Sequence, residues 1–177
     1  ISYVDAVQLK NEHMVKLPVI VYNGDSQAEV LTDAIDLRNK LEEIANAEYA
    51  KTGKYIRPIA LFQAQPKGKE DATTFEKLRD KLVDAGIPAD QIAIRTADVN
   101  ELKNVELMSP NCPIRYIITV NALKEGWDCP FAYILASLAN KTSQVDVEQI
   151  LGRILRLPHT SQHTQSDHNM SYVLTSS

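Results

Sequence analysis

The segment VEQILGRILRLP, residues 147–158, carries three side chains whose types and spacing suit phosphate binding. In a helix of about 100° per residue, Gln149, Arg153 and Arg156 fall within about 60° of one another. A guanidinium matches phosphate oxygens with a two-pronged fork, and two on one face suit a polyphosphate. Gly152 lies beside this row and lets a ligand approach closely, although glycine costs a helix about 1 kcal/mol. The pattern predicts either a phosphate-binding face or an amphipathic helix with a solvated basic face.

A second segment, ITVNALKEGWDCP, ends an apolar run with groups that could hold a nucleotide. The run ends near Val120, and Gly126 and Asp128 follow after a turn or short helix; in open α/β sheets ligands bind beyond the carboxyl ends of strands. A carboxylate and a flexible glycine at that place could hold a ribose or an arginine of a partner. A structural turn before Pro130 explains the same residues, and taken alone the segment favours that simpler interpretation.

The elements that must position these groups can be read from the hydrophobic pattern. Most of the apolar runs are continuous rather than alternating, which is typical of strands covered on both faces. Helical patterns separate them, and Gly86 is a plausible C-cap for one helix. This alternation predicts an α/β domain with a mainly parallel central sheet flanked by helices. The predicted strands are residues 18–22, 58–63, 91–96, 114–120, 131–138 and 171–176, and the predicted helices are residues 26–49, 72–85 and 146–155.

Length and composition are those of one ordinary folded domain. The 177 residues can bury a substantial core, and 44% are hydrophobic and 24% charged. We expect residues 1–24 to form a connector and first strand, and residues 25–177 to form the domain proper. The net charge of −4 argues against a protein that binds polyanions over its whole surface, but it allows a local basic groove. No apolar run approaches the roughly 18 residues of a membrane span.

Cysteine and histidine usage predicts a cytoplasmic protein without a metal site. Cys112 and Cys129 have no metal-type spacing, so a reduced, intracellular chain is expected, and the amino-terminal residues do not form a signal peptide. Three histidines, His159, His163 and His168, lie in a polar stretch. A solvated loop explains them better than a metal site does, because no cysteine or rigid helical face accompanies them.

Taken together, the segments EGWDCP (residues 125–130) and VEQILGRILRLP resemble motifs five and six of superfamily two helicases. The resemblance is closest to the helicase portion of the Res subunits of type III restriction-modification enzymes. RPIALFQAQ, residues 57–65, is similar to the motif four strand, and residues 6–23 are similar to the connector that enters this domain. The resemblance implies a three-layer RecA-like fold, the second of two such domains, with ATP bound in the cleft between them.

The resemblance also implies roles for single residues. Gln149 corresponds to the motif six glutamine near the terminal phosphates, and Arg153 and Arg156 correspond to arginines of which one or both serve as arginine fingers. The glycines and the carboxylate implied in nucleotide binding are Gly126, Asp128 and Gly152.

The resemblance further implies contact with a nucleic-acid backbone near the ends of two predicted strands. The residues concerned are Gln63, Lys67, Lys69 and Thr119. Exposed lysines are common on any loop, so Lys67 and Lys69 have an equally simple interpretation as solvated side chains.

Several parts of a complete motor are not recognisable in the sequence. No G-x-x-x-x-G-K-[ST] loop is present, and LANKTS, residues 138–143, has a Lys-Thr pair but lacks the glycines whose amides cradle phosphates. Neither an acidic box for magnesium nor a nuclease site is evident. ATP and Mg are therefore expected to be held mainly by a first domain, and this chain alone should not hydrolyse ATP appreciably.

The favoured hypothesis is the second motor domain of an ATP-dependent DNA helicase or translocase, a hydrolase within a type III restriction enzyme. The implied partners are DNA, the first RecA-like domain of the parent chain and a methyltransferase (modification) subunit. The alternative is a non-catalytic, helicase-like α/β domain that binds nucleic acid or docks to a protein. A stand-alone α/β enzyme acting on a small molecule is a third interpretation, which only the open sheet and the histidine-rich stretch favour.

Overall fold

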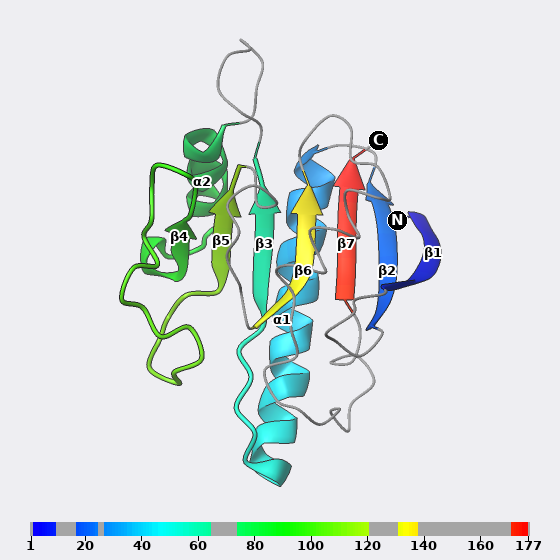
Figure 1. The fold of residues 1–177 in the computed structure, drawn as a ribbon. Coiled ribbons are helices and arrows are strands. Elements are labelled where there is room, and N and C mark those ends of the chain that lie inside the picture. The colour runs from blue at the N-terminus through cyan, green and yellow to red at the C-terminus, as the bar shows by residue number, and fades with distance from the viewer. Residues whose placement is uncertain are drawn as a thin grey trace.

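The computed structural model contains one seven-stranded sheet, in which only the β1–β2 pair is antiparallel (Figure 1). The strands are β1 (Ser2–Leu9), β2 (Leu17–Gly24), β3 (Ile59–Gln63), β4 (Ile92–Ile94), β5 (Tyr116–Thr119), β6 (Ala132–Ser137) and β7 (Ser171–Ser176). Their order across the sheet is β1-β2-β7-β6-β3-β5-β4. The structure describes residues 2–9, 17–24, 27–64, 74–120, 131–137 and 171–176. The prediction of an α/β domain with a mainly parallel sheet is confirmed.

Strands β3, β5 and β6 form the centre of the sheet and are buried on both faces. Every residue of β5 and β6 is buried, and in β3 only the last residue is partly exposed. Continuous apolar sequences produce this burial, because a strand covered on both faces has no polar side to present. Helices together with strands buried on both faces make a three-layer α/β arrangement. The predicted helix at residues 146–155 lies outside the described residues.

Helix α1 (Gln27–Thr52) lies behind the sheet in Figure 1 and packs against β2, β7, β6 and β3. Its buried side chains recur at spacings of three and four, which places them on one helical face. Two charged residues interrupt this apolar stripe. The buried residues of the stripe are Val30, Ala34, Arg38, Leu41, Ala45 and Glu48.

Helix α2 (Phe75–Asp84) packs against β5 and ends at the predicted glycine. Gly86 has a φ of +98°, and its N–H donates to Val83 O over 3.0 Å. The N–H of Ile87 donates to Leu82 O over 3.1 Å. These two bonds form a Schellman motif, which needs a left-handed residue at this position and so favours glycine. The C-cap prediction at Gly86 is confirmed. A short 3-10 helix, η1 (Ala89–Gln91), then leads into β4.

The outer edge of β4 is covered by the residues that follow it. The backbone N–H of Ile94 donates to Glu101 Oε1 over 2.8 Å, and the N–H of Glu101 donates to Ile94 O over 3.0 Å. Arg79 of α2 forms an ion pair with the same Glu101 oxygen at 2.6 Å. Among the described strands β4 lies at the edge, and here a side chain takes the place of a further strand, which is one way in which edge strands are protected from further pairing.

Strand β1 was not predicted, because its residues were assigned to a connector. It pairs with β2 from Ser2↔Asn23 to Leu9↔Leu17, with a register shift between Tyr3 and Asp5. An irregularity of this kind breaks the alternation by which strands are recognised in sequence. The connector segment therefore belongs to the sheet.

Over the residues that the structure describes, none of the helices has both the length and the apolar character that a membrane crossing requires.

Candidate functional site

Two of the predicted nucleic-acid contacts lie side by side at the carboxyl ends of neighbouring strands. Gln63 ends β3, Thr119 ends β5, and the two are register partners in the parallel ladder. The N–H of Ala64 donates to Thr119 O over 2.7 Å, so the two chains are still joined where they leave the sheet. The chain therefore leaves β3, in the segment similar to motif four, and β5, ahead of the segment similar to motif five, at the same edge, where α/β sheets bind ligands.

Ser137 extends this row on the other side of Gln63. It is the last residue of β6 and the register partner of Gln63. Sequence reasoning missed it, although a serine that ends the mostly apolar run AYILAS is a usable signal. We refer to Thr119, Gln63 and Ser137 as the polar row.

The polar row faces away from α1. The Nε of Arg38, on α1, donates to the phenol oxygen of Tyr116 over 3.2 Å, so Tyr116 of β5 points toward that helix. Side chains alternate between the two faces along a strand, so Thr119, three residues later, points to the opposite face. Register partners in a parallel ladder share a face, and Gln63 and Ser137 therefore point in the same direction as Thr119.

Burial differs within the polar row. Thr119 and Ser137 are completely buried, whereas Gln63 is half-buried. A direct contact from the Thr119 side chain to DNA would thus require this edge to open. The Oε1 atom of Gln63 is itself buried and has no hydrogen-bond partner among the residues that the structure describes. A buried acceptor without a donor costs about 1 to 3 kcal/mol, and few are found in folded proteins.

The backbone of a basic residue, Arg95, lies next to the polar row, and sequence reasoning also missed this residue. Arg95 follows β4, and its backbone N–H donates to Ile118 O over 2.8 Å, which places its backbone beside Thr119. Its guanidinium donates to Thr96 O, and the side chain is half-buried. The sequence alone could not show this neighbour, because the pairing of β4 with β5 brings the two residues together.

The predicted nucleotide site lies outside the described residues. In chain order, the segment that contains Gly126 and Asp128 joins β5 to β6, and the segment with the motif six residues joins β6 to β7. Both segments therefore start from the carboxyl edge that carries the polar row. In the part of the chain that the structure covers, no cluster of three or more His, Cys, Asp or Glu could hold a metal ion. The predicted residues outside the described ranges are Lys67, Lys69, Gly126, Asp128, Gln149, Gly152, Arg153 and Arg156.

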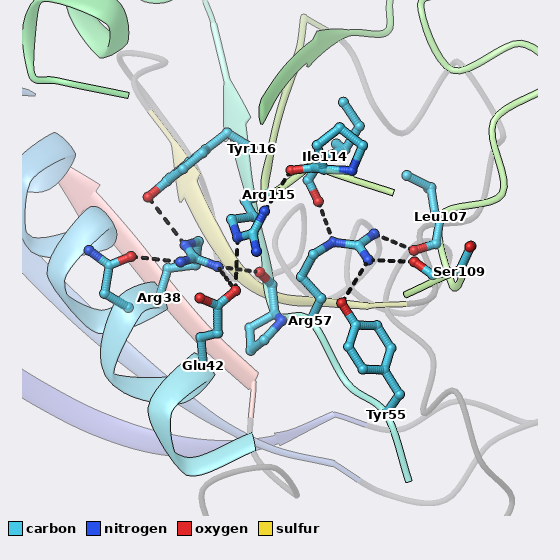
Figure 2. Close-up of polar contacts among 12 residues, drawn as sticks. Arg38, Glu42, Tyr55, Arg57, Leu107, Ser109, Ile114, Arg115 and Tyr116 are labelled. Carbon is cyan, nitrogen blue, oxygen red and sulfur yellow. Dashed lines mark hydrogen bonds and ion pairs between the residues drawn. The ribbon is translucent and has the colours of Figure 1, made fainter. Parts of the chain in front are cut away.

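A different polar cluster lies at the amino-terminal ends of the strands (Figure 2). Arg38 is almost fully buried, donates from Nη1 to Pro58 O over 3.0 Å, and pairs with Glu42 at 3.2 Å. Arg115, just before β5, donates from Nε to the same Glu42 oxygen over 2.8 Å. The Glu42 carboxylate thus joins α1 to the start of β5 through Arg115, while its pair with Arg38 lies within α1.

Arg57 is the most deeply buried charge of this region, at 1% exposure. Its Nε donates to Ile114 O over 2.7 Å, and its two terminal nitrogens donate to Ser109 O over 2.9 Å and to Leu107 O (Figure 2). No carboxylate in the described ranges forms an ion pair with Arg57. Three carbonyls of one loop therefore satisfy this guanidinium, which fastens the loop before β5 to the start of β3.

The pKa values in this cluster follow from its burial and charges. Burial raises the pKa of the Glu42 carboxyl, but hydrogen bonds and charges from Arg38 and Arg115 outweigh burial, and the net pKa lies below its ordinary value. Burial raises the pKa of the Tyr116 phenol, and the charge of Arg38 partly offsets this increase.

The arginine donors of this cluster are directed at acceptors within the fold, so we assign the cluster a structural role. The polar row at the opposite end of the strands is the candidate functional site.

Comparison with protein-family models found no family that matches this chain, and comparison with curated protein sequences found no match either. A functional assignment therefore depends on the residues of the chain and on their arrangement.

Proposed function

We propose that this chain is the second motor domain of an ATP-dependent DNA helicase or translocase, part of a type III restriction enzyme and acting in the cytoplasm. One observation supports this most. The segment that resembles motif four runs along β3 to the carboxyl edge of a parallel sheet, and the segments that resemble motifs five and six follow in the chain after β5 and β6, the two neighbours of β3 that end at the same edge. A motor domain needs its nucleotide and nucleic-acid contacts on one edge, where a first domain can close on them.

The chemistry proposed for the motif six residues is electrostatic. During phosphoryl transfer, charge spreads over the oxygens of the transferred group, and catalysis consists mainly of positioning and charge stabilisation. Arg153 and Arg156 would supply positive charge to an ATP held by the first domain, and Gln149 would lie near its terminal phosphates. An arginine finger increases the rate by about 10³ to 10⁵. Hydrolysis would then depend on closure of the two domains, which couples ATP turnover to movement along DNA.

The test uses a longer chain in which the ATP-binding domain precedes residue 1. We expect this protein to show DNA-stimulated ATP hydrolysis, and we expect Arg153→Ala and Arg156→Ala to reduce turnover, at least one of them by about 10³-fold or more. Arg79→Ala is the matched control, because Arg79 forms a surface ion pair on α2 and should leave turnover unchanged.

Folding of each variant is checked by its thermal unfolding midpoint. Full turnover in both motif six variants would refute the arginine-finger role. ATP hydrolysis that DNA does not stimulate would refute the motor function.

A further inference from the structure

We infer that Gln63 recognises a hydrogen-bond donor of a bound nucleotide strand, from a base N–H or a ribose hydroxyl, rather than a phosphate. This inference rests on the proposed function, since it assumes that a nucleic acid lies at the carboxyl edge. It goes further because it names the chemical group that is read. The observation behind it is the buried Oε1 atom of Gln63, which accepts no hydrogen bond from the residues that the structure describes.

The surroundings of Gln63 show why this oxygen has no donor. Its neighbours in the ladder are Thr119 and Ser137, both hydroxyl-bearing and both completely buried. Each hydroxyl could donate to Oε1, but neither does, and both residues take part in interactions elsewhere. The backbone of the strand is already committed to the ladder on both sides. Within the part of the chain that the structure describes, this acceptor is therefore unmet.

The position of Gln63 makes the acceptor available to a ligand. The side chain is half-buried, at the end of a central strand and on the face away from α1. The last side-chain torsion of glutamine is broad, so the amide can turn and bring Oε1 outward with little torsional cost. Turning toward a donor would exchange an unmet buried acceptor for a hydrogen bond.

The missing partner must be a donor, and this excludes phosphate. A phosphodiester has only acceptor oxygens at neutral pH, whereas base edges carry N–H groups and RNA carries 2′-hydroxyls. A phosphate could bond to the amide nitrogen of Gln63 but would leave Oε1 unsatisfied. Phosphate contacts give affinity without distinguishing one nucleotide from another, so a donor contact adds a different kind of recognition.

The experiment compares the 177-residue chain with its Gln63→Met variant in binding fluorescent single strands of equal length at low salt. Three strands are used: DNA, RNA of the same sequence, and an abasic strand that has phosphates but neither bases nor ribose hydroxyls. We expect Gln63→Met to weaken binding to DNA and RNA by about threefold to tenfold if a base is read, or to RNA alone if the 2′-hydroxyl is read. Binding to the abasic strand should not change.

A matched control is Gln91→Met, which makes the same chemical change on η1 at the opposite end of the sheet and should bind all strands like the wild type. Without nucleic acid, Gln63→Met should unfold at the same temperature as the wild type or higher, because the substitution removes an unmet acceptor.

Four outcomes would overturn the inference. An equal loss on all three strands would indicate a phosphate contact, and no loss on any strand would mean that Gln63 reads nothing. A lower unfolding temperature for Gln63→Met would mean that Oε1 is already satisfied in the free protein. Failure of the wild type to bind any strand would remove the proposed DNA function together with this inference, whereas the first three results leave that function intact.

Discussion

Glu42 is the residue whose ionisation matters most for the cluster at the amino-terminal ends of the strands. Its carboxylate lies between Arg38 and Arg115, and each guanidinium forms an ion pair with it. Because the buried Arg38 has acceptors on three sides, removing the carboxylate would leave a buried cation partly uncompensated. The ion pair with Arg115, together with the hydrogen bond from Arg38 to Tyr116, therefore holds helix α1 against the start of β5.

We predict that Glu42→Gln lowers the free energy of unfolding by about 1 to 3 kcal/mol at pH 7. The pKa of Glu42 in the folded protein is below its ordinary value of 4.5, so ionised Glu42 stabilises the fold fully above that pH. This contribution is lost as the pH falls through the lowered folded pKa. Urea unfolding between pH 7 and about pH 3 should show the two proteins converging in acid.

The control for this measurement is Glu106→Gln, an exposed residue of the loop before β5. It should unfold like the wild type throughout the pH range. A difference between wild type and Glu42→Gln that stays constant down to about pH 3 would contradict the proposed linkage.

At the scale of single elements, the turn after α2 provides a clear test of local conformation. Gly86 has a positive φ, and a Cβ built there would meet no atom within 4 Å. A substitution at this position therefore acts through backbone conformation and not through a clash. We predict that Gly86→Ala lowers the free energy of unfolding by about 1 to 2 kcal/mol. Gly86→Asn should cost less, because asparagine tolerates the left-handed region better. Chemical denaturation of both variants measures this, and an Ala variant as stable as the wild type would disprove it.

Most elements could be predicted from the sequence because their signals are local. Continuous apolar runs identified six strands, and a glycine after an amphipathic segment identified the end of α2. The predicted strand at residues 91–96 is shorter in the structure, where β4 covers Ile92–Ile94 and the chain then turns back to cover its edge. Strand β1 escaped prediction because the register shift between Tyr3 and Asp5 interrupts its pattern.

The candidate site could be predicted only in part, because it depends on which strands are neighbours. Gln63 and Thr119 were singled out from their place at strand ends, and the structure brings them together. Ser137 and Arg95 could not be joined to them from the sequence. Their proximity follows from β6 and β4 lying on either side of the β3–β5 pair, and hydrophobic periodicity carries no information on that order.

At the scale of the whole molecule, a net charge of −4 means that any attraction to DNA is local. We predict weak binding of a labelled single strand by the chain alone, with an affinity that falls as salt is raised. The slope should be about −0.7 in log affinity per log salt for each phosphate contacted. Fluorescence anisotropy at several salt concentrations measures this slope. Binding that does not respond to salt would contradict contact with the backbone.

The place of β7 has a consequence for how the molecule assembles. This strand comes last in the described chain, yet it lies between β2 and β6, and β2 has no other described neighbour except β1. During synthesis the β1–β2 pair therefore cannot form hydrogen bonds with the rest of the described sheet until residues 171–176 have left the ribosome. A polypeptide cut short before Ser171 would keep its first two strands, and β2 could still pack on α1, but β2 would lack the strand that joins it to the rest of the sheet.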